Sequence, residues 1–90
     1  MPNREFRGQL ELGLGHAAFM NKRWDEAEKR FSEVIEGYSD TKSAPEALYW
    51  KGVSHYKKTN DHTVLGETAE QFKQRYSDSI WALKTIPWAH

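Results

Sequence analysis

The sequence predicts an all-α fold of two antiparallel helix-turn-helix repeats followed by a short C-terminal capping helix. The first observation is a repeated pattern. The glycine of Leu14-Gly15 recurs 37 positions later in Lys51-Gly52, and Tyr38-Ser39-Asp40 recurs 38 positions later as Tyr76-Ser77-Asp78. The second is that apolar residues recur every three or four positions, and no stretch shows the alternation of a strand. A repeat of this length is typical of stacked helical units, each too small to bury its apolar face alone.

The first unit is predicted over residues 5–38 as two helices. The first helix runs from Glu5 to about Met20, and the apolar stripe that we expect in the core consists of Phe6, Leu10, Leu14, Ala17 and Ala18. The second helix runs from Trp24 to Gly37, and its expected buried face consists of Trp24, Ala27, Phe31, Val34, Ile35 and Tyr38. Glycine inside a helix costs roughly 1 kcal/mol relative to alanine. Gly13 and Gly15 therefore predict a closely packed neighbour.

The second unit is predicted over residues 44–76 and starts with a capping box, Ser43-Ala44-Pro45-Glu46. Its first helix extends to about Lys58, with core positions at Leu48, Gly52, His55 and Tyr56. Its second helix extends from Thr63 to Tyr76, with core positions at Leu65, Ala69, Phe72 and Tyr76. A capping helix over residues 79–86 ends before Pro87, because the residue before proline avoids the helical region.

Composition limits the classes of partner. The chain has 90 residues, which we interpret as a single domain over 1–90, with 13 basic and 13 acidic residues and no cysteine. A neutral chain lacks the positive field that drives binding to nucleic acid or to an anionic membrane surface. No apolar run approaches the ~20 residues of a membrane span, so we expect no membrane insertion.

Nothing in the sequence selects an active site. The four histidines are not at helical ligand spacing, no glycine-rich phosphate loop follows a strand, and the carboxylates are scattered along helix faces. We therefore expect a protein that is not an enzyme and has no catalytic residue, no cofactor and no metal site.

The residues of the first unit resemble the tetratricopeptide repeat, whose signature is W-x2-L-G-x2-Y…A-x3-F…P. Leu14-Gly15 and Ala27-x-x-x-Phe31 fall at the spacing of that signature. The chain departs from it at Glu11, Ala18 and Ser39, and in the second unit Leu65 and Ala69 exchange the small and large positions. The segment 38–52 is similar to longer-turn repeats of bacterial cell-envelope proteins, such as the TolA-binding protein and the barrel-assembly lipoprotein. Similar repeats form tails of thioredoxin-like proteins.

The resemblance implies a bacterial scaffold that binds a protein or peptide segment in a concave groove lined by the first helix of each unit. By position, the implied groove residues are Leu12, His16, Phe19, Met20, Tyr49, Val53, Tyr56 and Lys57, with Gln9 and Glu46 beside them. An alternative places Phe19 and Tyr56 in the core between helices. The clamp that grips acidic C-terminal tails needs basic and asparagine residues where Leu12 and His16 stand, so no such tail is expected.

A second interpretation is structural. The segment would then serve self-association, as a homodimer, or docking within a larger bacterial protein, because about three repeats are normally needed for stability. The compartment stays open: a native start at Met1 predicts the cytoplasm, and an excised envelope domain predicts the periplasm.

Overall fold

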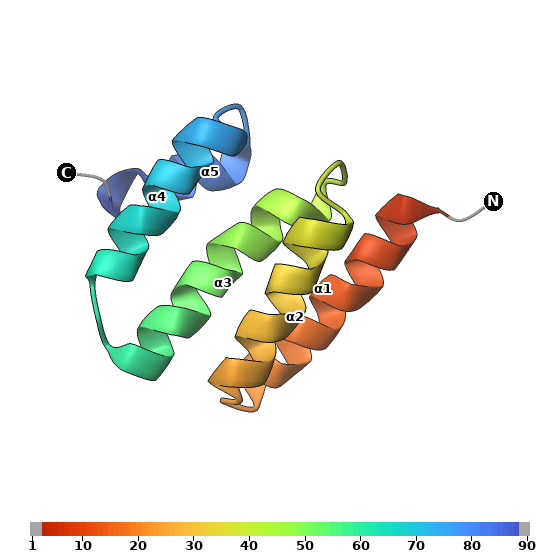
Figure 1. The fold of residues 1–90 in the computed structure, drawn as a ribbon, viewed down its shortest axis with the longest axis horizontal. Helices are drawn as coiled ribbons and strands as arrows, with labels where there is room; N and C mark the ends of the chain where they lie inside the picture. Colours follow the sequence, from red (N-terminus) through yellow and green to blue (C-terminus); the bar gives the residue numbers. More distant parts are fainter. Residues whose placement is uncertain (1–2, 89–90) are drawn as a thin grey trace.

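A computed structural model of the protein describes residues 3–88 (Figure 1). Its elements are α1 (Arg4–Met20), α2 (Trp24–Gly37), α3 (Ser43–Thr59), α4 (Thr63–Arg75), α5 (Ile80–Lys84) and a short 3-10 helix, η1 (Ile86–Trp88). No strand occurs within 3–88. The prediction of an all-α fold of helical hairpins with a short C-terminal helix is therefore confirmed.

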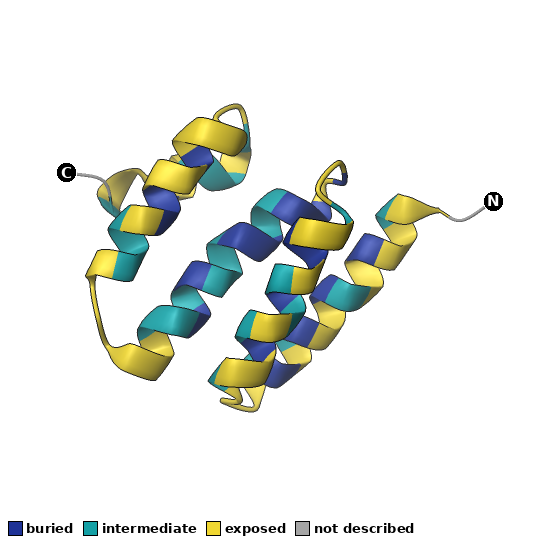
Figure 2. Ribbon diagram, in the orientation of Figure 1, coloured by how far each residue is buried: buried dark blue, intermediate teal, exposed yellow. Residues whose placement is uncertain are grey.

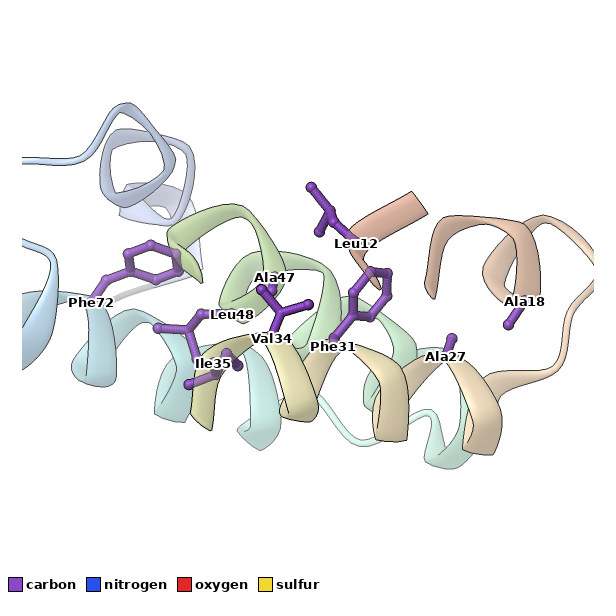
Figure 3. Packing of buried hydrophobic residues seen from close by; sticks show 9 residues of the cluster. All are labelled: Leu12, Ala18, Ala27, Phe31, Val34, Ile35, Ala47, Leu48 and Phe72. Atoms are coloured by element: carbon purple, nitrogen blue, oxygen red, sulfur yellow. The ribbon is translucent and has the colours of Figure 1, made fainter. Parts of the chain in front are cut away.

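The helices form two layers, with α1, α3 and α5 in one and α2 and α4 in the other (Figures 1 and 3). Helix α2 packs against both α1 and α3, and α3 packs against α4. Neighbours in the first layer also touch, as α1 contacts α3 and α3 contacts α5, whereas α2 and α4 have no close backbone contact in the described chain. The array is thus tighter on the α1, α3 and α5 side, which we call the inner side.

The core lies between the layers and is supplied mainly by α2. Ala27, Phe31 and Val34 are 0 % exposed and Ile35 is 5 % exposed, and Figure 3 shows Ala27, Phe31 and Val34 pointing from α2 towards the first layer. They meet Leu12 and Ala18 of α1, Ala47 and Leu48 of α3, and Phe72 of α4. The predicted buried face of α2 is confirmed at these four positions, while Trp24 and Tyr38 are only half-buried.

The predicted core stripe of α1 is wrong. Phe6, Leu10 and Leu14 are 57 %, 54 % and 46 % exposed, and Ala17 is exposed as well, so that only Ala18 of the predicted stripe is buried (Figure 2). Helix α1 instead buries the opposite side, which consists of Gly8, Leu12, Gly15 and Ala18. Small side chains on that side let α2 and α3 come close to α1, so that the helices pack as densely as a protein interior requires.

Two glycines mark the closest contacts between paired helices. A Cβ on Gly15 would lie 2.5 Å from Cε1 of Phe31, and a Cβ on Gly52 would collide with the side chain of Thr68. Thr68, and not Ala69, therefore occupies in the second unit the place that Phe31 has in the first. A Cβ on Gly13 would meet nothing within 4 Å, so the neighbour predicted there is absent from the described chain.

The predicted capping box at Ser43 is also wrong. Lys42 already has helical dihedrals (φ −67°, ψ −19°), so Ser43 lies inside α3 and cannot take the extended conformation of an N-cap. Both carboxylate oxygens of Glu5 instead accept a hydrogen bond from the Lys42 backbone N–H at 3.1 Å. Glu46 turns away from the helix start, towards His16 and Trp50. The start of α3 is thus stabilised by a residue of α1.

Residues in the C-terminal part of the chain are less completely buried than those of the first unit. In α4, Ala69 and Phe72 are 2 % and 0 % exposed, while Leu65 and the predicted core residue Tyr76, which directly follows the helix, are half-buried. In α3 the same holds for His55 and Tyr56. The fifth helix ends at Lys84, earlier than predicted, and η1 continues it. The exposed apolar residues of this end are Ile80, Leu83 and Ile86, at 65 %, 64 % and 62 %.

Candidate functional site

The inner side carries a continuous series of aromatic side chains, which we call the aromatic row. Its members are half-buried and come from all three helices of the inner layer, from the start of α2 and from η1: Phe19, Trp24, Tyr49, Trp50, Trp81 and Trp88. Successive ring centroids lie about 5 Å apart, from Trp24–Phe19 at 5.1 Å and Phe19–Trp50 at 5.3 Å to Trp50–Tyr49 at 5.2 Å. Most of these contacts are edge-to-face, the geometry that aromatic quadrupoles prefer.

Tyr49 connects the row to the C-terminal elements. Its ring lies 5.1 Å from that of Trp81 and 4.9 Å from that of Trp88, where the two planes are nearly parallel at 21°. Trp50 also faces Trp81, at 6.3 Å. The short α5 and η1 are thus attached to α3 by aromatic packing, and this packing extends the inner side beyond the two repeats.

A carboxylate lies at the centre of the row. Glu46 Oε2 accepts a hydrogen bond from Trp50 Nε1–H at 3.3 Å and lies 3.1 Å from His16 Nε2. The imidazole ring of His16 is held edge-on between Phe31 at 5.4 Å and Trp50 at 5.2 Å. The side chains of His16 and Glu46 remain 33 % and 28 % exposed. They can therefore be reached from solvent while their orientation is fixed by the rings around them.

Most of the predicted groove residues lie open on this side. His16, Phe19, Tyr49, Val53 and Tyr56 are half-buried, and Met20 and Lys57 are exposed. The prediction that Leu12 lines the groove is wrong. Leu12 is 7 % exposed and belongs to the core, because α1 lies close enough to α3 to cover it. Tyr56 lies towards the α3–α4 turn, with its ring 5.1 Å from that of His62.

Sequence reasoning did not predict that the tryptophans gather on this surface, although its alternatives placed Trp50 between the units or exposed to solvent, and Trp88 against the capping helix or a further domain. Trp24 and Trp81 fit core positions by spacing, and Trp88 follows a proline, so none fell in the register of the first helix of a unit. The available signal was composition, because four of the 90 residues are tryptophan, a side chain so large that it is rarely buried completely.

The opposite side carries an ion cluster between α2 and α3. Glu28 Oε2 lies 2.9 Å from His55 Nδ1, Glu28 Oε1 lies 3.1 Å from Lys58 Nζ, and Lys58 also pairs with Asp25 at 3.0 Å. Burial raises the pKa of the Glu28 carboxyl, but the hydrogen bonds from His55 and Lys58 outweigh it and lower the pKa below the usual 4.5. A cleft of about 120 Å³ adjoins this cluster, lined in part by Gly52 and Thr68, where the second unit lacks a phenylalanine.

The lowered pKa of Glu28 predicts an acid-sensitive contribution to stability. A carboxyl whose pKa is lower in the folded state stabilises the fold above its unfolded pKa, and this stabilisation is lost as the pH falls through the folded value. Glu28→Gln should therefore lower the free energy of unfolding by about 1 kcal/mol at pH 7, and the difference from wild type should shrink below pH 4.5. Urea unfolding at several pH values measures this. The control is Glu26→Gln, at an exposed position of the same helix, and an equal effect of both variants would contradict the prediction.

Within residues 3–88, no three histidine, aspartate or glutamate side chains are placed to hold a metal ion. None of the described helices has the length and apolar character needed to cross a bilayer. Comparison of the chain with protein-family models, with curated proteins and with solved structures gives no match.

Proposed function

We propose that this chain is a tetratricopeptide-type interaction module, not an enzyme, that binds a protein or peptide segment along its inner side. The observation that supports this proposal is the aromatic row, whose rings are half-exposed although the helices that carry them are packed. Tyrosine and tryptophan in such positions are the residue types that dominate binding energy at protein interfaces.

The surface is arranged before any partner binds. Each ring of the row rests against another ring at about 5 Å, and Trp50 is also held by its hydrogen bond to Glu46. Side chains that are already ordered lose little conformational entropy on binding, so more of the contact energy becomes affinity. The surface is small, and we therefore expect modest affinity.

The chemistry of the surface defines the segment that fits. Apolar, aromatic or proline side chains would lie against the rings of Phe19, Tyr49 and Trp81. A hydrogen-bond donor or a basic side chain would approach the partly exposed carboxylate of Glu46, beside His16. Lys57 at the far end of α3 favours an acidic residue at the corresponding end of the ligand.

Selection from a random-peptide phage library tests the proposal, followed by titration of the enriched peptides with intrinsic tryptophan fluorescence. We expect peptides that bind wild type and bind Tyr49→Ala at least ten-fold more weakly. Tyr38→Ala is the matched control, because Tyr38 is also a half-buried tyrosine but lies outside the row, next to Arg4. Failure to enrich any peptide, or equal loss in both variants, would contradict the proposal.

A second function, docking or self-association within a larger bacterial protein, is favoured by a different observation. Terminal units of helical repeat arrays need a polar outer face, whereas the free side of α1 exposes Phe6, Leu10 and Leu14. This side is separate from the aromatic row, so both functions can operate in one chain.

A further inference from the structure

The free side of α1 is an apolar surface, which we call the α1 outer face. Its residues share one side of the helix, opposite the buried Gly8, Gly15 and Ala18, and all are exposed: Phe6, Leu10, Gly13, Leu14 and Ala17. The face contains no charged residue. Helix α1 lies at one edge of the array, so nothing in the described chain covers it (Figures 1 and 2).

Comparison of α1 with the equivalent helix of the second unit, α3, shows what kind of neighbour the α1 outer face does not fit. The positions of α3 that lie 37 residues after Phe6, Leu10 and Ala17 are Ser43, Ala47 and Ser54, which are 4 %, 0 % and 0 % exposed. These small residues let the first unit lie close to α3, with Ser43 beside Gly8 of α1. Phe6 and Leu10 would hold a preceding unit of the same kind away from the N-terminal half of α1. The α1 outer face therefore requires an occupant with a different distribution of large and small residues.

The large and small residues of the α1 outer face can pack against each other when two copies of the helix lie antiparallel. Along the middle of the face, the N-terminal half carries the large Phe6 and Leu10 and the C-terminal half carries the small Gly13 and Ala17, with Leu14 at the margin. We propose that the α1 outer face binds a second copy of this chain, α1 antiparallel to α1, about a two-fold axis level with residues 11 and 12. Phe6 then lies over the second copy's Ala17, and Leu10 lies over the second copy's Gly13.

Gly13 supports this arrangement. It costs helix stability, and a Cβ there would meet nothing within 4 Å, so no contact in the described chain explains it. In the proposed dimer it lies at the crossing point of the two helices, where a side chain would hold the backbones apart. Ridges formed by residues four apart, such as Phe6, Leu10 and Leu14, pack into each other in the commonest class of helix crossing.

Charge also favours a second copy in this orientation. The chain has a formal net charge of +0, so two copies do not repel at long range. The charged residue nearest the face is Arg7, and the two-fold axis separates its two copies by roughly 14 Å along the helix, beyond the screening length of about 8 Å.

The contact area indicates a weak dimer. A helix of 17 residues is about 25 Å long and about 10 Å wide. One face of it buries less than the ~800 Å² per partner of a standard stable interface. We therefore expect association at high micromolar concentration and dissociation on dilution.

Sedimentation equilibrium from low micromolar to millimolar concentration tests the proposal on wild type, Leu10→Glu and Leu83→Glu. Leu10 and Leu83 are 54 % and 64 % exposed, so neither change disturbs the core, and circular dichroism verifies the helix content. We expect wild type and Leu83→Glu to dimerise alike, and Leu10→Glu to weaken the dimer at least ten-fold. A wild type that is monomeric at every concentration would overturn the proposal, as would association lost in Leu83→Glu but kept in Leu10→Glu.

A size exchange tests the two-fold geometry itself. Ala17→Phe alone should abolish the dimer, because it places two phenylalanines against each other. The double variant Phe6→Ala/Ala17→Phe should regain it, because large again faces small. Failure of the double variant to regain association would overturn the antiparallel register. Tyr49→Ala leaves this face intact, so its effect on peptide binding and the effect of Leu10→Glu on dimerisation report separately on the aromatic row and the α1 outer face.

Discussion

Phe31→Ala should be the most destabilising single truncation in this chain, lowering the free energy of unfolding by about 3–5 kcal/mol. Phe31 is 0 % exposed, its ring fills the space left by Gly15, and it supports the imidazole of His16. The substitution removes an aromatic ring from the point where α1, α2 and α3 meet, and the surrounding helices cannot collapse fully onto the cavity. A domain of this size has only about 5–15 kcal/mol of stability in total.

The matched control for this prediction is Phe6→Ala. Phe6 is 57 % exposed, so its truncation should change the free energy of unfolding by less than about 1 kcal/mol. Urea unfolding is measured at low micromolar protein, where the proposed α1 dimer is dissociated and Phe6 makes no contact with a second copy. Similar losses for the two variants would mean that Phe6 contributes to the core and that the packing of α1 described above is wrong.

Helix α2 shows what the sequence predicts well. It has a single apolar stripe and charged residues on its remaining sides, so periodicity alone identifies both the helix and its buried face. The predicted and observed bounds agree at Trp24 and Gly37. The resemblance to the tetratricopeptide repeat likewise implies, by position, that His16, Tyr49 and Val53 lie on the same side, and all three are half-buried.

Helix α1 shows where periodicity fails. It has two candidate core sides, one with large apolar residues and one with Gly8, Gly15 and Ala18, and summed hydrophobicity selects the wrong one. Which of the two sides is buried depends on how closely α2 and α3 approach α1, and the sequence of α1 alone does not contain this information. The capping box failed for a related reason, since Glu5 reaches Lys42 only after α1 has packed. The C-terminal part of the aromatic row depends on tertiary structure in the same way, because Trp81 and Trp88 reach Tyr49 only through the path of the chain after α4.

Substitution by alanine at Gly15 and at Gly13 of α1 should have opposite effects on the free energy of unfolding. Gly15→Ala should lower the free energy of unfolding by about 1–3 kcal/mol, because the new Cβ would lie 2.5 Å from Cε1 and 2.7 Å from Cδ1 of Phe31. Those atoms belong to a fully buried ring, so the ring or the helix must move. Gly13→Ala should raise the free energy of unfolding by about 0.5–1 kcal/mol, because the new Cβ meets nothing within 4 Å and alanine favours the helix.

This pair separates two explanations for glycine in a helix, since both residues carry the same intrinsic cost and only one has a neighbour in the described chain. Thermal and urea unfolding at low micromolar protein measure both effects without a contribution from association. At high concentration, Gly13→Ala should also weaken the proposed dimer, because the added methyl group lies where the second copy's Leu10 packs. A destabilising effect of Gly13→Ala on the dilute protein would show that α1 has a neighbour at Gly13 within one chain, and Gly13 would then give no support to a second copy.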